Sequence, residues 1–192
     1  MSQRKFWMRW RVRAGYPVAL AYLVLARPTP RSIACGAIPA ALGLLIRGIS
    51  SGYLRKDSEL ATAGPYAYTR NPLYFGSAFL AAAFIVAGGS WIAGILVGVY
   101  FAVFYYAVMR NEEEDLCVRF GAAFEEYAAS VPLFFPWPGN RRRAARAQPR
   151  RENDKFSRAQ YLRNREYKAA IGTIASLAIL FLRMWVRRRW GL

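Results

Sequence analysis

Residues 72–109 form the longest stretch of the chain without Asp, Glu, Lys or Arg. About 20 consecutive apolar residues are enough for a helix to cross the hydrocarbon core of a bilayer. A hairpin buried inside a soluble helix bundle is the alternative, but a soluble domain mixes its apolar and charged residues along the chain. The stretch therefore predicts a transmembrane helical hairpin.

The charged residues lie at the edges of the apolar runs. The net charge of +17 alone could indicate binding to nucleic acid. The basic residues, however, precede the first apolar run (Arg4, Lys5, Arg9, Arg11, Arg13) and follow the fourth (Arg141, Arg142, Arg143, Arg146). This placement is typical of membrane edges, where basic residues bind anionic headgroups and favour the cytoplasmic side. We predict a multi-pass protein of the inner or plasma membrane and no nucleic-acid partner.

The pattern of apolar runs and breakers predicts an all-α, polytopic bundle. We expect about four transmembrane helices, over residues 6–26, 32–54, 72–87 and 91–109, with a turn at Gly88-Gly89-Ser90. Residues 111–130 predict an amphipathic helix at the interface, because Leu116, Phe120, Phe124 and Tyr127 recur at helical spacing. Small residues for tight packing of the hairpin are present at Gly76, Ala81, Ala82, Gly94 and Gly98.

Three segments are expected along the chain: a membrane domain over 1–138, a basic linker over 139–168 and a C-terminal hydrophobic helix over 169–192. The apolar part of the last segment is short and is interrupted by Arg183. A fifth crossing would place Arg187, Arg188 and Arg189 on the outer side, which the positive-inside rule disfavours. An interfacial position is the alternative, and the sequence leaves the choice open.

The chain contains no histidine, which excludes histidine-based acid–base catalysis and imidazole metal sites. Its two cysteines, Cys35 and Cys117, have neither CxxC spacing nor a histidine partner. We therefore expect no metal site and no disulfide.

Two polar clusters flank the uncharged stretch. One covers residues 64–76 at the start of the third helix, and the other covers residues 110–116 at the end of the fourth. Because both open ends of a hairpin lie on the same membrane face, we expect the two clusters to meet in space.

Together the clusters offer groups for a mixed polar ligand. The first turn of the third helix and Arg70 suit a carboxylate. Glu112 and Glu113 suit a cationic or hydroxylated group, and aromatic faces attract alkylated cations (Tyr66, Tyr74, Tyr105, Tyr106). S-adenosylmethionine combines these chemical features. Taken singly, the same residues are also typical of interface anchors, a solvated helix end and, at Gly76, helix packing.

The two clusters also carry a family pattern. The segment GPYAYTRNPLYFG, followed by the hairpin and by RNEEEDLCVRFGAAFEEYAASVPLFFP, resembles the isoprenylcysteine carboxyl methyltransferase and phospholipid methyltransferase family. That family has GxY…RHPxYxG, then an EE pair, then L…FG…Y..Y…VP..P, and the likeness covers residues 54–136. It implies methyl transfer from S-adenosylmethionine to a carboxylate or amine on a lipid or lipid-linked acceptor.

By position, the resemblance implies which residues serve the site. The cofactor-binding residues would be Gly64, Tyr66, Arg70, Asn71, Tyr74, Gly76, Glu112 and Glu113, with Glu114 as an alternative one position away. Asn71 replaces the usual histidine of the family, so a proton-shuttle role there is in doubt. We expect the cofactor to enter from the cytoplasm and the acceptor from the bilayer, meeting near Tyr105 and Tyr106, with Arg110 steering an anionic acceptor.

Two other functions stay open from the sequence. A membrane reductase using a nicotinamide cofactor is one, although no glycine-rich dinucleotide loop is present. A non-catalytic lipid-binding protein, held by its basic ends on anionic lipid, is the other.

Overall fold

The computed structural model describes residues 3–55, 59–136 and 155–190. Within these ranges the chain forms seven α-helices and one short 3₁₀ helix, and no strand. The helices are α1 (Gln3–Leu25), α2 (Pro30–Tyr53), α3 (Pro72–Gly88), α4 (Trp91–Phe120), α5 (Ala122–Ser130), α7 (Arg158–Arg163) and α8 (Tyr167–Trp190), and the 3₁₀ helix is η1 (Gly64–Ala67). The predicted all-α architecture is confirmed.

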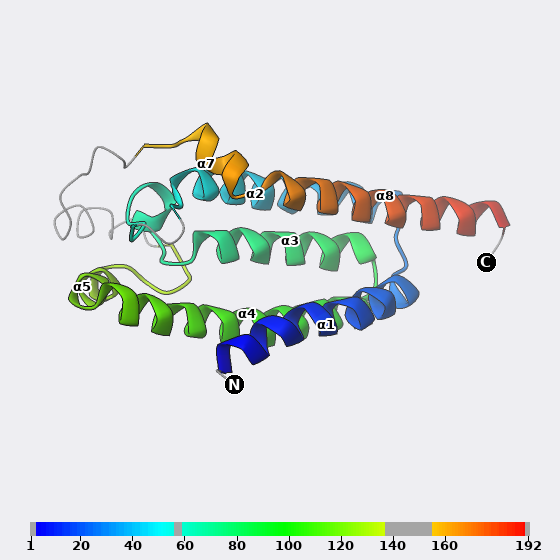
Figure 1. The fold of residues 1–192 in the computed structure, drawn as a ribbon. Coiled ribbons are helices and arrows are strands. Elements are labelled where there is room, and N and C mark those ends of the chain that lie inside the picture. The colour runs from blue at the N-terminus through cyan, green and yellow to red at the C-terminus, as the bar shows by residue number, and fades with distance from the viewer. Residues whose placement is uncertain (1–2, 56–58, 137–154, 191–192) are drawn as a thin grey trace.

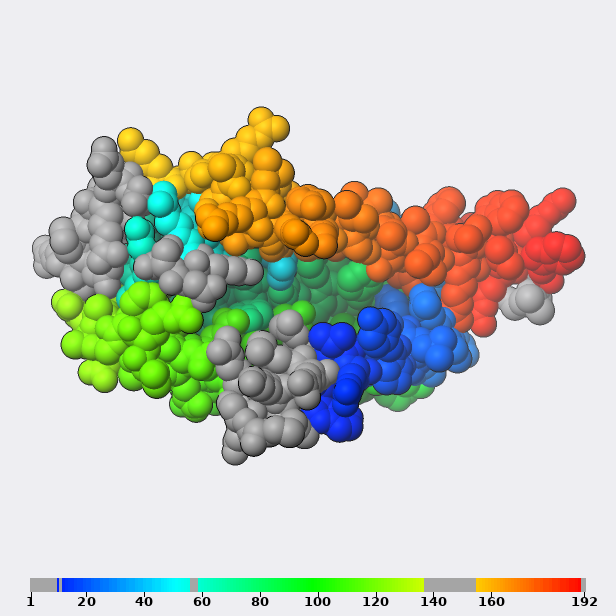
Figure 2. All heavy atoms as spheres, viewed as in Figure 1, coloured from blue at the N-terminus to red at the C-terminus, as the bar shows by residue number. Residues whose placement is uncertain are grey.

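The long helices lie side by side along one direction (Figure 1). Helix α3 contacts both α2 and α4, while α1 packs on α4 and α8 packs on α2 and α3. In the space-filling view the atoms of α3 are set back between α8 and the pair formed by α1 and α4 (Figure 2). Helix α3, which carries the first polar cluster at its start, is therefore the centre of the bundle.

The surface of the bundle is apolar enough for a bilayer. Helices α2, α4 and α8 are each long and apolar enough to cross a membrane, and α1 and α3 contain shorter apolar stretches. Large apolar side chains point outward from several helices (Leu20, Val24, Ile38, Leu45, Ile95, Val99, Ile174, Phe181). Exposed apolar side chains along helices of this length are typical of a surface that faces lipid. The chain is an integral membrane protein with several apolar helices.

The closest helix contact is between α2 and α3, and glycines make it possible. A Cβ atom at Gly43 would lie 2.7 Å from the carbonyl oxygen of Gly76. One at Gly36 would lie 2.7 Å from the carbonyl oxygen of Ala83. Gly94, by contrast, leaves room for Ile85 of α3. The expectation that Gly76 packs the α3–α4 hairpin is therefore wrong, because this glycine faces α2.

Helix α4 does not end at Met109, as the sequence pattern predicted, but continues to Phe120. The acidic run after Met109 contains no helix breaker, so the backbone stays helical as it leaves the apolar zone. It ends at Gly121, whose φ of +52° lies in the left-handed region. Helix α5 follows, and its Phe124 and Tyr127 pack with Leu116 and Phe120 as the spacing predicted.

Helix α8 begins two residues before the predicted C-terminal helix and continues through Arg183, where its apolar run is interrupted. It runs alongside α2, and its C-terminus lies at the end of the bundle opposite to α5 (Figure 1). The Arg183 guanidinium donates hydrogen bonds to the carbonyl oxygens of Ala26 (2.7 Å) and Val24 (2.8 Å). These carbonyls end α1 and have no partner within the helix. Arg183 is thus accommodated as a cap of another helix.

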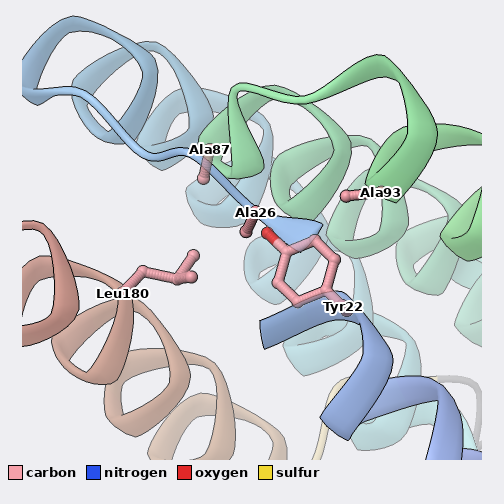
Figure 3. Close-up of a cluster of buried hydrophobic side chains, with 5 residues drawn as sticks. All are labelled: Tyr22, Ala26, Ala87, Ala93 and Leu180. Carbon is pink, nitrogen blue, oxygen red and sulfur yellow. The ribbon is translucent and has the colours of Figure 1, made fainter. Parts of the chain in front are cut away.

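A small apolar cluster closes this end of the bundle. Leu180 of α8 points toward Ala26 and Ala87, and Tyr22 and Ala93 complete the group (Figure 3). The Tyr22 hydroxyl donates a hydrogen bond of 2.6 Å to the carbonyl oxygen of Phe84. The cluster joins α1, α3, α4 and α8, so the C-terminal helix is part of the bundle.

The predicted basic linker is described only in part. Residues 139–154 of it lie outside the described residues, whereas Arg158–Arg163 form helix α7. Helix α7 packs against α2.

Candidate functional site

The approach to α3 is held by the segment that follows α5. The backbone N–H of Arg70 donates to the carbonyl oxygen of Pro132 (2.9 Å), and the Thr69 hydroxyl donates to that of Phe134 (2.8 Å). The Asn71 side-chain amide donates to the carbonyl oxygen of Leu133 (3.0 Å). Residues 69–71 are therefore fixed before α3 begins.

Asn71 occupies the N-cap position of α3, as predicted, but its side chain makes no capping hydrogen bond. Its amide is engaged with Leu133 instead. Asn71 is 8% exposed and Pro72 follows as the first helical residue. The Asn71 side chain therefore anchors the segment before α3 to Leu133, and the helix begins at the next residue.

The two polar clusters meet in space, as the hairpin geometry predicted. Arg70 Nη1 lies 2.5 Å from Glu113 Oε1, and Arg110 Nη1 lies 2.9 Å from Glu113 Oε2. Glu113 is 8% exposed, so a buried carboxylate is paired with two guanidinium groups. Arg70 and Glu113 contact each other directly. A ligand would therefore bind against this pair, and not in a gap between its members.

A second contact joins the same two helices. The Tyr74 hydroxyl donates a 2.7 Å hydrogen bond to Glu112 Oε1. The ring of Tyr74 packs edge-on against Tyr105, with 5.6 Å between the ring centroids. Tyr105 in turn stacks on Phe101 at 4.3 Å. Aromatic surface therefore lies beside the acidic residues.

A cavity of about 910 Å³ lies against these contacts. Seven of the residues predicted for the site line it: Tyr66, Arg70, Asn71, Tyr74, Tyr105, Glu112 and Glu113. Its volume is at the upper end of the about 300–1,000 Å³ typical of small-molecule sites. The cavity can accommodate a cofactor together with part of a second substrate.

Four predicted residues lie outside the lining of the cavity. Gly64 has a φ of +60° and faces the Tyr53 ring, so it serves the start of η1. Gly76 faces α2, and Tyr106 is 59% exposed on the outer side of α4. Arg110 reaches the site only through its ion pair with Glu113.

Several walls of the cavity were not predicted from the sequence. Helix α1 contributes Val12, Gly15, Tyr16 and Ala19, and further charged side chains come from four other segments (Arg47, Arg55, Glu59, Asp115, Arg119, Glu166). Arg47 could have been found, because it is the only charged residue between Ser32 and Leu54. An ionisable residue inside an apolar helix usually marks a functional site. The α1 residues have no such signal.

The lining of the cavity is acidic relative to the rest of the protein. Five of the chain's 11 acidic residues line it, together with four arginines. The chain as a whole carries a net charge of +17. The lining therefore offers carboxylates to a cationic group and guanidinium groups to an anionic one.

Several polar groups at the site are buried. Arg70 Nε is buried and has no hydrogen-bond partner among the described residues. Tyr127 donates a 2.7 Å hydrogen bond to the carbonyl oxygen of Tyr66. Burial raises the pKa of both tyrosines well above the ordinary value of 10.0, so both hydroxyls keep their protons at a pH where an exposed tyrosine loses its own.

These raised pKa values predict how stability depends on pH. Above pH 10 the unfolded chain releases the Tyr127 proton while the folded protein keeps it, so the free energy of unfolding falls as pH rises. In Tyr127→Phe this fall is expected to be shallower. The same variant loses the bond to Tyr66 and is expected to be about 1–3 kcal/mol less stable at pH 7. Thermal unfolding of both proteins in detergent between pH 7 and 11 measures the two effects; equal slopes would contradict the assignment.

Comparison with known proteins finds a family model that covers most of the predicted site residues. Residues 40–123 match the phospholipid methyltransferase family model, which confirms the resemblance over this segment. Nickel-cobalt-cadmium resistance protein NccN of Alcaligenes xylosoxydans xylosoxydans is 38% identical over 86 residues, 43% of this chain and 38% of NccN. Cobalt-zinc-cadmium resistance protein CzcN of Cupriavidus metallidurans is 35% identical over 82 residues, 43% of this chain and 38% of CzcN.

A third relative is itself a methyltransferase. Protein-S-isoprenylcysteine O-methyltransferase of Schizosaccharomyces pombe is 32% identical over 81 residues, 42% of this chain and 34% of that protein. The chain thus spans well under half the length of the curated relatives that it matches. No solved structure matches the chain.

Proposed function

We propose that this protein, whose residues 40–123 match the phospholipid methyltransferase family, transfers a methyl group from S-adenosylmethionine to a lipid or lipid-linked acceptor. The observation that carries the proposal is the cavity at which Arg70 of the α3 entrance meets Glu112 and Glu113 of α4. Its acidic lining suits a sulfonium and an ammonium group, and the buried Arg70 Nε is a donor for a carboxylate.

The residues of the site have separate roles in this proposal. Arg70 and Glu113 hold each other in place, so that their remaining hydrogen-bonding capacity faces a ligand without rearrangement. Tyr74 fixes Glu112, and the ring of Tyr105 offers an aromatic face to an alkylated cation. When bound, S-adenosylmethionine supplies an activated methyl group. The protein contributes positioning and exclusion of water, because a carboxylate or amine can attack such a methyl group unaided.

The site is proposed to face the cytoplasm of the inner or plasma membrane. The described segments at the site end of the bundle carry more basic residues than those at the other end (Figure 1). They are Arg55, Arg70, Arg110, Arg119, Lys155, Arg158, Arg163, Arg165 and Lys168, against Arg27, Arg31, Arg183, Arg187, Arg188 and Arg189. The positive-inside rule assigns the more basic end to the cytoplasm. The same residues would hold the protein on anionic headgroups.

Two relatives are named for metal resistance, but we propose no metal-binding role here. The described residues contain no group of three His, Cys, Asp or Glu side chains that could hold an ion. Two of the carboxylates that line the cavity are in direct ion pairs, Glu113 with Arg70 and Glu166 with Arg47.

Calorimetry on the purified protein in detergent tests the proposal. We expect S-adenosylmethionine and its demethylated product, S-adenosylhomocysteine, to bind with micromolar dissociation constants. Reduced nicotinamide dinucleotide is expected not to bind. Binding of the dinucleotide alone would favour a reductase, and binding of neither compound would favour a non-catalytic lipid-binding protein. Membranes incubated with radiolabelled methyl donor, followed by lipid extraction, would then identify the acceptor.

A further inference from the structure

A second, half-buried ion pair lies in the wall of the same cavity. Arg47 Nε lies 2.5 Å from Glu166 Oε1, and the side chains are 20% and 12% exposed. Arg47 Nη1 donates to the carbonyl oxygen of Leu73 (3.3 Å) and to the Ser77 hydroxyl. Arg47 is thus held on two sides although it lies inside an apolar helix.

Glu166 reaches this position because the C-terminal segment is docked on the end of α2. Gln160 donates to the carbonyl oxygen of Leu54 (2.8 Å), and Asn164 donates to those of Ser51 (2.8 Å) and Leu54 (2.9 Å). These carbonyls lie at the end of α2, where the helix offers no partners of its own. Glu166 lies outside residues 40–123, so the family match does not include it.

The guanidinium of Arg47 keeps one nitrogen available. Its bonds to described residues use Nε and Nη1, which leaves Nη2 without a protein partner among them. Arg47 and Glu166 both line the cavity. Since the other two nitrogens fix the plane of the group, Nη2 is a preorganised donor at the cavity wall.

The rest of the lining indicates what this donor would bind. Val12 and Ala19 of α1 give the cavity an apolar side, and Arg47 adds a charged donor within the span of α2. Guanidinium groups form their strongest hydrogen bonds with carboxylate and phosphate oxygens. A molecule with an aliphatic chain and an anionic oxygen head group combines the two features.

We propose that Arg47 binds the anionic oxygen group of the methyl acceptor, and that Glu166 is the resident counter-ion with which this anion shares the guanidinium. The inference rests on the methyl transfer proposed above, and it narrows the acceptor to an acidic amphiphile. The C-terminal segment then adjusts acceptor affinity, because Glu166 opposes the incoming negative charge. Arg70 and Glu113 remain on the donor side of the cavity.

Binding of simple amphiphiles in nanodiscs of phosphatidylcholine tests this inference. Radiolabelled laurate and dodecyl phosphate are the probes, with dodecanol as the uncharged control. We expect laurate, dodecyl phosphate or both to bind saturably and dodecanol to bind at least about tenfold more weakly. The preferred probe distinguishes a carboxylate acceptor from a phosphate one.

Variants assign the binding to Arg47. Arg47→Gln is expected to weaken binding of the preferred probe at least about tenfold, because the charged donor is lost. Glu166→Gln keeps an oxygen for Arg47 Nε but removes the competing charge, so binding is expected to become about two- to fivefold tighter. Arg163→Gln, an exposed neighbour in α7, is the control and should bind like the wild type.

The outcomes separate this inference from the proposed function. Equal binding of all three amphiphiles, no saturable binding, or wild-type binding in Arg47→Gln would overturn the role of Arg47. Weaker binding in Glu166→Gln would overturn the counter-ion role. Binding of S-adenosylhomocysteine is measured on the same samples. Its absence in the wild type would refute the methyl-transfer proposal, whereas its retention in Arg47→Gln shows that this variant is folded.

Discussion

Glutamine in place of Glu113 is expected to weaken the binding of S-adenosylhomocysteine by about 10–100-fold, because hydrogen bonds to charged groups contribute about 1.5–3 kcal/mol. Glu113 joins Arg70 of one cluster to Arg110 of the other. Glutamine keeps the size of the side chain but loses the charge that orients both guanidinium groups. Affinity is therefore expected to fall because the two guanidinium groups are no longer oriented at the site that binds the methyl donor.

The neighbouring glutamate provides a matched control. Glu114 is exposed, belongs to the same helix and carries the same charge. Glu114→Gln is expected to bind S-adenosylhomocysteine like the wild type. Calorimetry of both variants at equal ionic strength shows whether Glu113 or Glu114 serves the site. Weaker binding in Glu114→Gln together with unchanged binding in Glu113→Gln would assign the role to Glu114.

The stability of Glu113→Gln has to be measured as well. Glu113 is 8% exposed and its partner Arg70 is largely buried, so a change at this pair costs folding free energy in addition to ligand affinity. An unfolding midpoint for Glu113→Gln that stays above the assay temperature assigns the loss of affinity to the site.

The central part of the fold could be predicted because one physical constraint determines it. A charge-free stretch over residues 72–109 must cross the bilayer twice, and this alone brings Arg70 and Glu113 to the same end. Similarly, the 3.6-residue period placed Phe124 and Tyr127 on the buried face of α5. Neither conclusion needed knowledge of distant contacts.

The rest of the site depends on contacts that no local pattern records. Arg47 and Glu166 are 119 positions apart, and their pairing follows from how α7 docks on α2. The edge of the apolar zone at Met109 predicts the wrong end for α4, because the helix continues in water until Gly121 breaks the backbone. Gly76 was assigned to the ligand by its motif, and its neighbours in α2 became visible only in the packed bundle.

The contact between α2 and α3 is expected to be the most sensitive to added volume. In Gly43→Leu the new Cβ atom would lie 2.7 Å from the carbonyl oxygen of Gly76 and 3.0 Å from Leu80, so the two helices must move apart. Overpacking costs about 1–3 kcal/mol where side chains can yield. Here backbone opposes backbone, so we expect the upper end of this range and a fall of about 5–10 °C in the unfolding midpoint.

Separation of α2 from α3 would also disturb the site, because Arg47 of α2 forms hydrogen bonds to Leu73 and Ser77 of α3. Gly172→Leu is the control, since a Cβ atom at Gly172 of α8 meets nothing within 4 Å. Both substitutions replace a helical glycine by the same residue, so propensity effects cancel between them. Thermal unfolding in detergent measures the difference. Equal midpoints for the two variants would show that the α2–α3 glycines do not set the spacing on which the cavity depends.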